Sequence, residues 1–160
     1  MPIQRILYIA AGLIVIGVAL FLFRLWQPEM QVRKHSAHLT DAIAHKDWAS
    51  FANFVGENYH DQWGNDRAAV LERTREVFQY LHRVRFSAIG PTVRIENGAG
   101  YWRASIMIEG AEDNELMAIV RARVNALQTP FELEWHQMSA KPWDWKLMAV
   151  GNAELNISSE

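Results

Sequence analysis

The hydrophobic and polar positions of this chain divide it into one continuous apolar run and a longer part in which the two kinds alternate. The apolar run extends from Ile6 to Phe23, 18 residues without a charged side chain, between Arg5 and Arg24. A helix of that length extends for roughly 27 Å, close to the hydrocarbon thickness of a bilayer. We therefore expect Ile6–Phe23 to contact the lipid bilayer as a transmembrane helix, with Trp26 at the headgroup boundary.

This run predicts two parts: a transmembrane anchor with its flanks, residues 1–27, and one soluble domain, residues 28–160. A cleaved signal peptide has a shorter apolar core followed by small residues at the cleavage site. Gly17-Val18-Ala19 resembles such a site, but the apolar run continues past it to Phe23. We expect the segment to be retained, which makes the chain a single-pass membrane protein.

The orientation of the anchor is predicted differently by its flanking charges and by its position in the chain. Basic residues mark the cytoplasmic flank of a membrane segment. Arg5 precedes the run, whereas Arg24, Arg33 and Lys34 come after it, which favours a cytoplasmic domain. An N-terminal apolar segment behind a short basic tail usually directs the export of the domain attached to it, however. On that basis we expect the domain on the non-cytoplasmic side.

The first part of the domain has helical periodicity. Apolar and small residues recur at spacings of three and four between Pro28 and His45, and a shorter segment with the same spacing runs from Trp48 to Val55. Tyr59–Trp63 is predicted to be extended. Asp66 is a typical N-cap residue, and the pattern behind it predicts a third helix that continues to Leu81 and ends at His82.

From Arg83 onward the period changes to two, which indicates strands. Asn97-Gly98 predicts a hairpin turn between the first two strands. Further strands are predicted at Trp102–Ile108, Leu116–Ala126, Phe131–His136 and Trp145–Gly151. Arg123 of the strand Leu116–Ala126 is expected to lie opposite Glu134 of the strand Phe131–His136. Three helices packed on a strongly curved antiparallel sheet make an α+β fold.

This order of elements, with three local sequences, carries a resemblance to a known family. The local sequences are Ala44-His45-Lys46-Asp47-Trp48, the stretch Tyr59–Gly64, and Trp145-Lys146-Leu147. The chain resembles the nuclear transport factor 2-like superfamily, also called cystatin-like, in its polyketide-cyclase and ketosteroid-isomerase-like branch. The resemblance implies a cone-shaped domain with a pocket between sheet and helices, and it makes a homodimer plausible.

Charge and composition exclude several functions. The net charge is −2 and the basic residues form no cluster, which argues against nucleic acid as a partner. The sequence has no cysteine, no glycine-rich phosphate loop and no nucleophile elbow, and we predict no cofactor. His38, Asp41 and His45 share one helix face, but that face is expected to be solvated, so no metal site is predicted.

The alternation of the strands predicts an apolar interior without an acid or a base. The residues expected to line a ligand pocket in this interior are all aromatic: Trp63, Trp102, Phe131, Trp135 and Trp145. A polar site is predicted only at the mouth of the cone, where Asp61 would be the general base, assisted by Tyr59 and His82.

These patterns are compatible with two functions. The favoured one is a membrane-tethered, non-catalytic binding or accessory domain, whose ligand is a small apolar molecule or a membrane-associated partner protein. The alternative is a small-molecule enzyme of the isomerase or cyclase kind that uses Asp61. A deep pocket that reaches Asp61 would favour the enzyme, and an interior filled by Trp and Phe side chains would favour binding.

Overall fold

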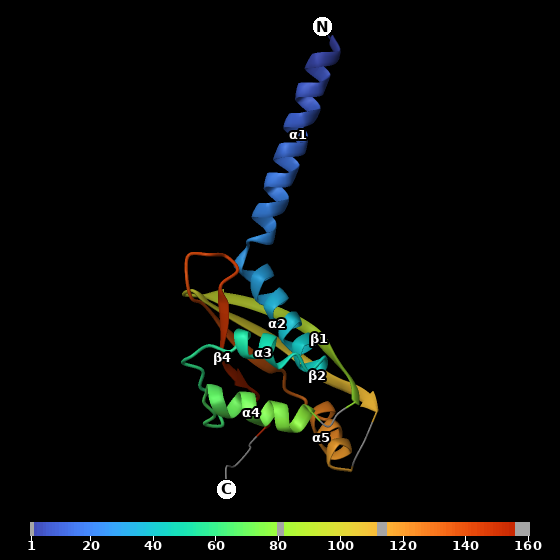
Figure 1. The fold of residues 1–160 in the computed structure, drawn as a ribbon, viewed down its shortest axis with the longest axis vertical. Helices are drawn as coiled ribbons and strands as arrows, with labels where there is room; N and C mark the ends of the chain where they lie inside the picture. Colours follow the sequence, from blue (N-terminus) through green and yellow to red (C-terminus); the bar gives the residue numbers. More distant parts are fainter. Residues whose placement is uncertain (1, 80–81, 112–114, 156–160) are drawn as a thin grey trace.

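The computed structural model describes residues 2–79, 82–111 and 115–155, and within these it contains five helices and a four-stranded antiparallel sheet (Figure 1). Helix α1, Pro2–Leu25, extends away from the rest of the chain, and α2, Pro28–Ala44, begins after a short break. Among residues with described side chains, no single helix is both long and apolar enough to cross a membrane. The bent pair Ala11–Arg24 and Pro28–Ala44, at 64°, meets that requirement together by length and composition alone.

Capping residues determine where the short helices begin. Asp47 precedes α3, Trp48–Phe54, and its carboxylate accepts a hydrogen bond from the Ser50 N–H at 3.1 Å. Asp66 precedes α4, Arg67–Phe78, and accepts one from the Ala69 N–H at 2.8 Å, as the sequence predicts. Helix α4 ends at Phe78, and His82 begins a strand, so the expectation that His82 ends the third helix is wrong.

The strands β1 (His82–Glu96), β2 (Ala99–Ala111), β3 (Phe131–Gln137) and β4 (Trp145–Gly151) pair in the order of the sequence. Asn97 and Gly98, both with positive φ, form the predicted turn between β1 and β2. Strand β1 has one extra residue between Ile89 and Thr92, where Gly90 has a φ of 62°. This bulge bends β1.

The segment predicted as a strand at Leu116–Ala126 is instead the helix α5, Glu115–Asn125. Val120 and Val124 are spaced for one helix face as well as for alternation, and the segment is rich in residues that favour helices. The Asn125 side-chain amide accepts from the Ile108 N–H at 2.8 Å and donates to the Ile108 carbonyl at 3.0 Å, which docks α5 on β2. The predicted pairing of Arg123 with Glu134 is therefore wrong.

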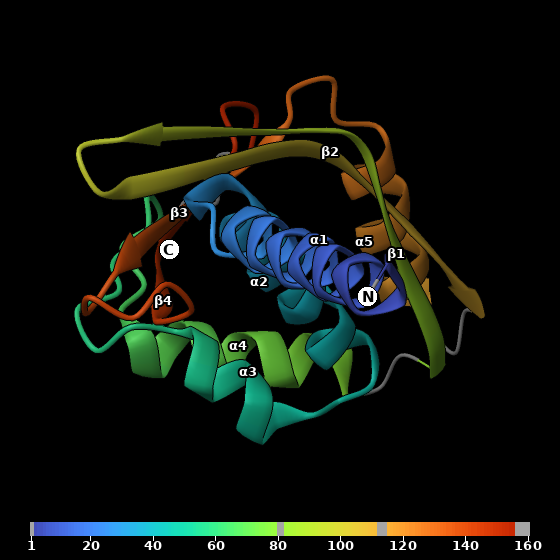
Figure 2. The ribbon, with the colours of Figure 1, turned by 90° about the horizontal axis from the view of Figure 1, so that it is seen from above.

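The core lies where α2 crosses the sheet, with β1 and β2 on one side and α3 and α4 on the other (Figure 2). Val32 of α2 is fully buried, and Gly100 of β2 lies so close to it that any side chain at Gly100 would collide with Val32. The sheet contributes five further large core residues, Trp102, Leu133, Trp135, Trp145 and Leu147, and α3 with the segment after it contributes Phe51, Val55 and Tyr59.

Candidate functional site

Three of the five aromatic residues predicted to line a pocket, Trp102, Trp135 and Trp145, are buried in the core. Trp135 and Trp145 are 0% and 2% exposed, whereas Trp63 and Phe131 are partly buried. The Trp135 ring makes edge-on contacts with His35 and Phe54, at centroid distances of 5.7 and 6.3 Å. The interior at this end of the sheet is thus occupied by side chains.

Asp61 is buried, and both oxygens of its carboxylate accept hydrogen bonds. One oxygen accepts from the Tyr59 hydroxyl at 3.2 Å and from the Asn65 side-chain amide at 2.8 Å. The other accepts from the N–H groups of Trp63 at 3.0 Å and Asn65 at 2.9 Å. A carboxylate has about four acceptor positions, and here each has a donor. The carboxylate therefore organises the loop from Tyr59 to Asn65.

Tyr59 and Trp63 also hold this loop to the rest of the domain. The Tyr59 ring is buried, and burial together with the neighbouring Asp61 raises the pKa of its hydroxyl. The Trp63 Nε1–H donates to the Leu155 carbonyl at 2.6 Å. His82 is not among the residues whose side chains the structure describes. The catalytic role of Tyr59, Asp61 and His82 therefore stays a prediction.

A large cavity lies elsewhere, in a groove between α2 and the β1–β2 hairpin. It has a volume of about 890 Å³, and Trp102 is the one predicted pocket residue that lines it. Phe86, Pro91 and Ile106 complete an apolar wall on the sheet side. We call this cavity the α2–β1 groove.

Helix periodicity explains why α2 lines the groove along most of its length. Arg33, Ala37, Asp41 and Ala44 succeed one another at spacings of four and three, so they share one face. Val32, Leu39 and Ala42 lie on another face and are buried in the core. The helix is therefore anchored by one face while it presents the other to the groove.

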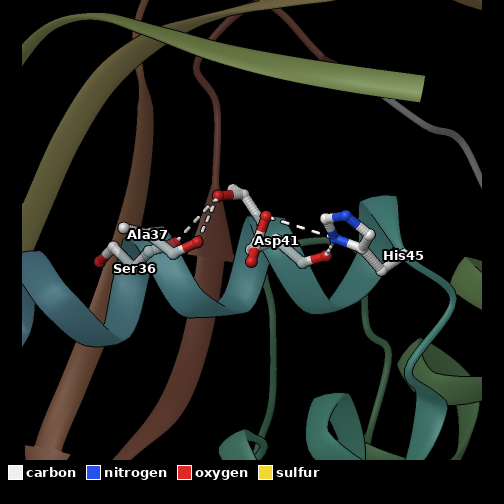
Figure 3. Close-up of polar contacts among 5 residues, drawn as sticks. Ser36, Ala37, Asp41 and His45 are labelled. Carbon is white, nitrogen blue, oxygen red and sulfur yellow. Dashed lines mark hydrogen bonds and ion pairs between the residues drawn. The ribbon is translucent and has the colours of Figure 1, made fainter. Parts of the chain in front are cut away.

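Polar side chains form the α2 rim of the groove, and Figure 3 shows the contacts between two of these residues, Asp41 and His45. His45 Nδ1 lies 2.9 Å from the Asp41 carbonyl and 3.3 Å from the Asp41 carboxylate, and since both oxygens are acceptors, Nδ1 is the donor. The Thr40 hydroxyl donates to the carbonyls of Ala37 at 2.9 Å and Ser36 at 3.3 Å. His38, Asp41 and His45 are exposed, and in the described part of the chain no group of three such residues could hold a metal ion.

Two arginines supply positive charge at the groove. The Arg33 guanidinium donates to the Pro91 carbonyl at 3.5 Å, next to the bulge of β1. Arg85 comes from the start of β1, is exposed, and has no ion-pair partner among the described residues. The sequence does not predict that Arg33 and Arg85 line one cavity, because the distance between them depends on the bend of β1. The sequence feature that could have pointed to Arg85 is its position next to the apolar Phe86 in the alternating pattern.

His35 lies on α2 beside the groove residues but faces the core. Its Nδ1 lies 2.8 Å from the Gln31 carbonyl, and its ring contacts Phe54 and Trp135. Burial is the main reason that the pKa of His35 is lowered from 6.5. His35 is therefore a neutral core residue near neutral pH.

Comparison with known proteins supports the fold. No protein-family model and no curated protein matches the chain. Among solved structures, a protein provisionally named an aromatic ring hydroxylase, from Novosphingobium aromaticivorans, is 12% identical with a TM-score of 0.58, over 77% of this chain and 85% of that one. A nuclear transport factor 2-like protein of unknown function from Pseudomonas putida is 9% identical with a TM-score of 0.56, over 76% and 82%.

Bd1075 of Bdellovibrio bacteriovorus is 8% identical with a TM-score of 0.57, over 76% of this chain, which spans only 40% of Bd1075. Nuclear transport factor 2-like and cystatin-like proteins recur among the structural neighbours; most have no known function, and others have provisional hydroxylase or dehydratase names. At these identities the likeness concerns the fold alone. The chain is similar to the nuclear transport factor 2-like fold in an α+β domain with five helices and a four-stranded antiparallel sheet.

Proposed function

We propose that the chain is a membrane-tethered, non-catalytic domain that binds a small apolar molecule with an acidic group in the α2–β1 groove. The observation that carries the proposal is the combination of an apolar wall, Phe86, Trp102 and Ile106, with the guanidinium groups of Arg33 and Arg85 at the same cavity. Ligand sites are commonly apolar clefts in which a few polar groups set orientation. Guanidinium groups favour carboxylates and phosphates.

The sequence and the exposure of α1 support the membrane tether. The 18 apolar residues of Ile6–Phe23 lie within this helix, and the side chains from Ala11 to Arg24 are exposed. Such a contiguous apolar surface is costly in water and favourable in a bilayer. A domain behind this helix would hold its groove at a constant distance from the membrane.

The enzyme alternative has less support from the same geometry. The Asp61 carboxylate already accepts four hydrogen bonds, and protonation at either oxygen would disturb them. A general base needs an acceptor position within reach of its substrate. The α2–β1 groove instead presents His38, Asp41 and His45, which are exposed to solvent.

Calorimetric titration of the full chain in lipid nanodiscs, with empty nanodiscs subtracted, tests the proposal. Naphthylacetate is the acidic probe and naphthylacetamide is its neutral counterpart. We expect naphthylacetate to bind at least about tenfold more tightly, because a hydrogen bond to a charged group contributes about 1.5–3 kcal/mol. Arg85→Gln should remove most of that preference.

Arg73→Gln is the matched control, because Arg73 is an exposed arginine of α4 that does not line the groove. Ile106→Trp should block both probes by filling the apolar wall. Equal affinity of the acid and the amide, or an equal loss in Arg85→Gln and Arg73→Gln, would refute the acidic-ligand proposal.

A further inference from the structure

The loop between β3 and β4 exposes large apolar side chains. Trp143 is 56% exposed and Met138 is 51% exposed. Lys141 lies between them in the sequence and is exposed too. We call residues 138–144 the β3–β4 loop.

Hydrogen bonds hold this loop in a defined shape. The Met138 N–H donates to the Asp144 carbonyl at 2.8 Å, which closes the loop, and the Asp144 N–H donates to the Lys141 carbonyl at 3.1 Å. The Trp145 Nε1–H donates to the Pro142 carbonyl at 2.9 Å from a buried indole. The loop therefore holds Trp143 in an exposed position by its own hydrogen bonds.

The loop lies at the end of the domain from which α1 leaves. Figure 1 shows it beside the junction of α1 and α2. The Trp143 backbone also lies close enough to the His35 ring on α2 to influence the pKa of that ring. His35 is seven positions after Pro28, so it lies roughly 10 Å along the helix from the start of α2.

The side chains at this end match the chemistry of a lipid headgroup region. Tryptophan concentrates at that boundary because its indole combines a large apolar ring with one N–H donor. Trp26, 50% exposed, comes directly after α1 at the same end. Lysine near a bilayer surface gains from anionic headgroups. The chain thus exposes Trp26, Met138 and Trp143 where α1 would enter a membrane.

We propose that the β3–β4 loop inserts Trp143 and Met138 into the headgroup region of the bilayer that holds α1, and that this second contact fixes the orientation of the domain. The loop contact rests on the membrane tether of the proposed function. Its occupant is a lipid surface, with Lys141 facing anionic headgroups.

Single cysteines in the cysteine-free chain allow each position to be measured separately. The full chain with Trp143→Cys is labelled with a bimane fluorophore and reconstituted in vesicles of phosphatidylcholine and phosphatidylglycerol, some of the lipids carrying bromine as a quencher. Met138→Cys is a second probe of the loop. Val15→Cys reports on α1, and Ile119→Cys, an exposed position of α5 away from the junction, is the aqueous control.

We expect strong quenching at Val15→Cys and only weak background quenching at the aqueous control Ile119→Cys. At Trp143→Cys and Met138→Cys we expect at least about twice the background of that control, as for other interfacial positions. Quenching at Val15→Cys with none at both loop positions would overturn the loop contact and leave the tether standing. No quenching at Val15→Cys would overturn the tether and the loop contact together. A bimane emission at the loop positions that shifts to the blue as protein density in the vesicles rises, without quenching by brominated lipid, would show that the loop is covered by protein. That result would assign the surface to a second copy or a partner protein and would also overturn the proposal.

Discussion

Replacing Trp135 by alanine should cost the domain a large part of its stability. An indole that buries about 150–250 Å² contributes roughly 4–6 kcal/mol at 25 cal/mol per Å². Trp135 is fully buried and makes edge contacts with His35 and Phe54, each contributing about a further 0.5–1.5 kcal/mol. Its Nε1–H has no hydrogen-bond partner among the described residues, so truncation also relieves an unsatisfied donor that costs about 1–3 kcal/mol.

We therefore expect Trp135→Ala to lower the free energy of unfolding by about 3–5 kcal/mol. Urea titration of the full chain in mild detergent, monitored by near-ultraviolet circular dichroism, measures the change. Glu134→Ala, at the neighbouring position, is the control. The Glu134 side chain is about a third exposed and its Oε1 lies 2.7 Å from His136 Nε2, so this substitution should cost under about 1 kcal/mol. A loss below about 1 kcal/mol for Trp135→Ala, or equal losses for the pair, would refute the assignment of the sheet faces.

Three further predictions concern pH, the Asp61 loop and orientation. Because burial lowers the pKa of His35 from 6.5, the unfolded chain binds a proton at His35 more readily than the folded chain, so the His35 contribution to stability should be complete above about pH 6.5 and be lost below it. In thermal melts, the melting temperature of His35→Phe should fall less steeply with decreasing pH than that of the wild type. An equal slope for the two proteins would contradict the assignment. Asp61→Ala leaves four donors without their acceptor and should cost at least about 2 kcal/mol in thermal unfolding; a stability equal to wild type would show that the loop does not need it. A membrane-impermeant maleimide should label Ala153→Cys in intact cells, whereas labelling only after lysis would place the domain in the cytoplasm.

Much of the element order could be predicted from periodicity, because most elements bury one face and expose the other. Asp66 at the start of α4 and the Asn97-Gly98 turn are local signals that need no tertiary information. Leu116–Ala126 is wrongly predicted as a strand because Val120 and Val124 fit both periods over so short a segment. The choice of helix depends on contacts with another element, such as the double hydrogen bond between Asn125 and Ile108.

The candidate site was less predictable than the fold, because the groove depends on how two elements meet. Alternation predicts that Trp102 faces the interior, and Trp102 is buried and lines the groove. Arg33 and Arg85 are far apart in the sequence, and the cavity that they share depends on the bulge around Gly90. A bulge inserts one residue without leaving a clear trace in the hydrophobic pattern, so the side chains beyond it cannot be assigned to a face from the sequence.

The contact between α2 and β2 has a consequence for how the groove would bind. Val32 lies against Gly100 with no space for another atom, so α2 cannot move closer to the sheet there. Arg33 is the next residue of α2 and lines the groove, which means that the core contact also sets the separation of the groove walls. A groove whose width is set by a buried contact exists before its ligand arrives, as most small-molecule sites do. Binding would then order the exposed side chains of Arg85 and His45 at the rim, while α2 and the hairpin keep their positions.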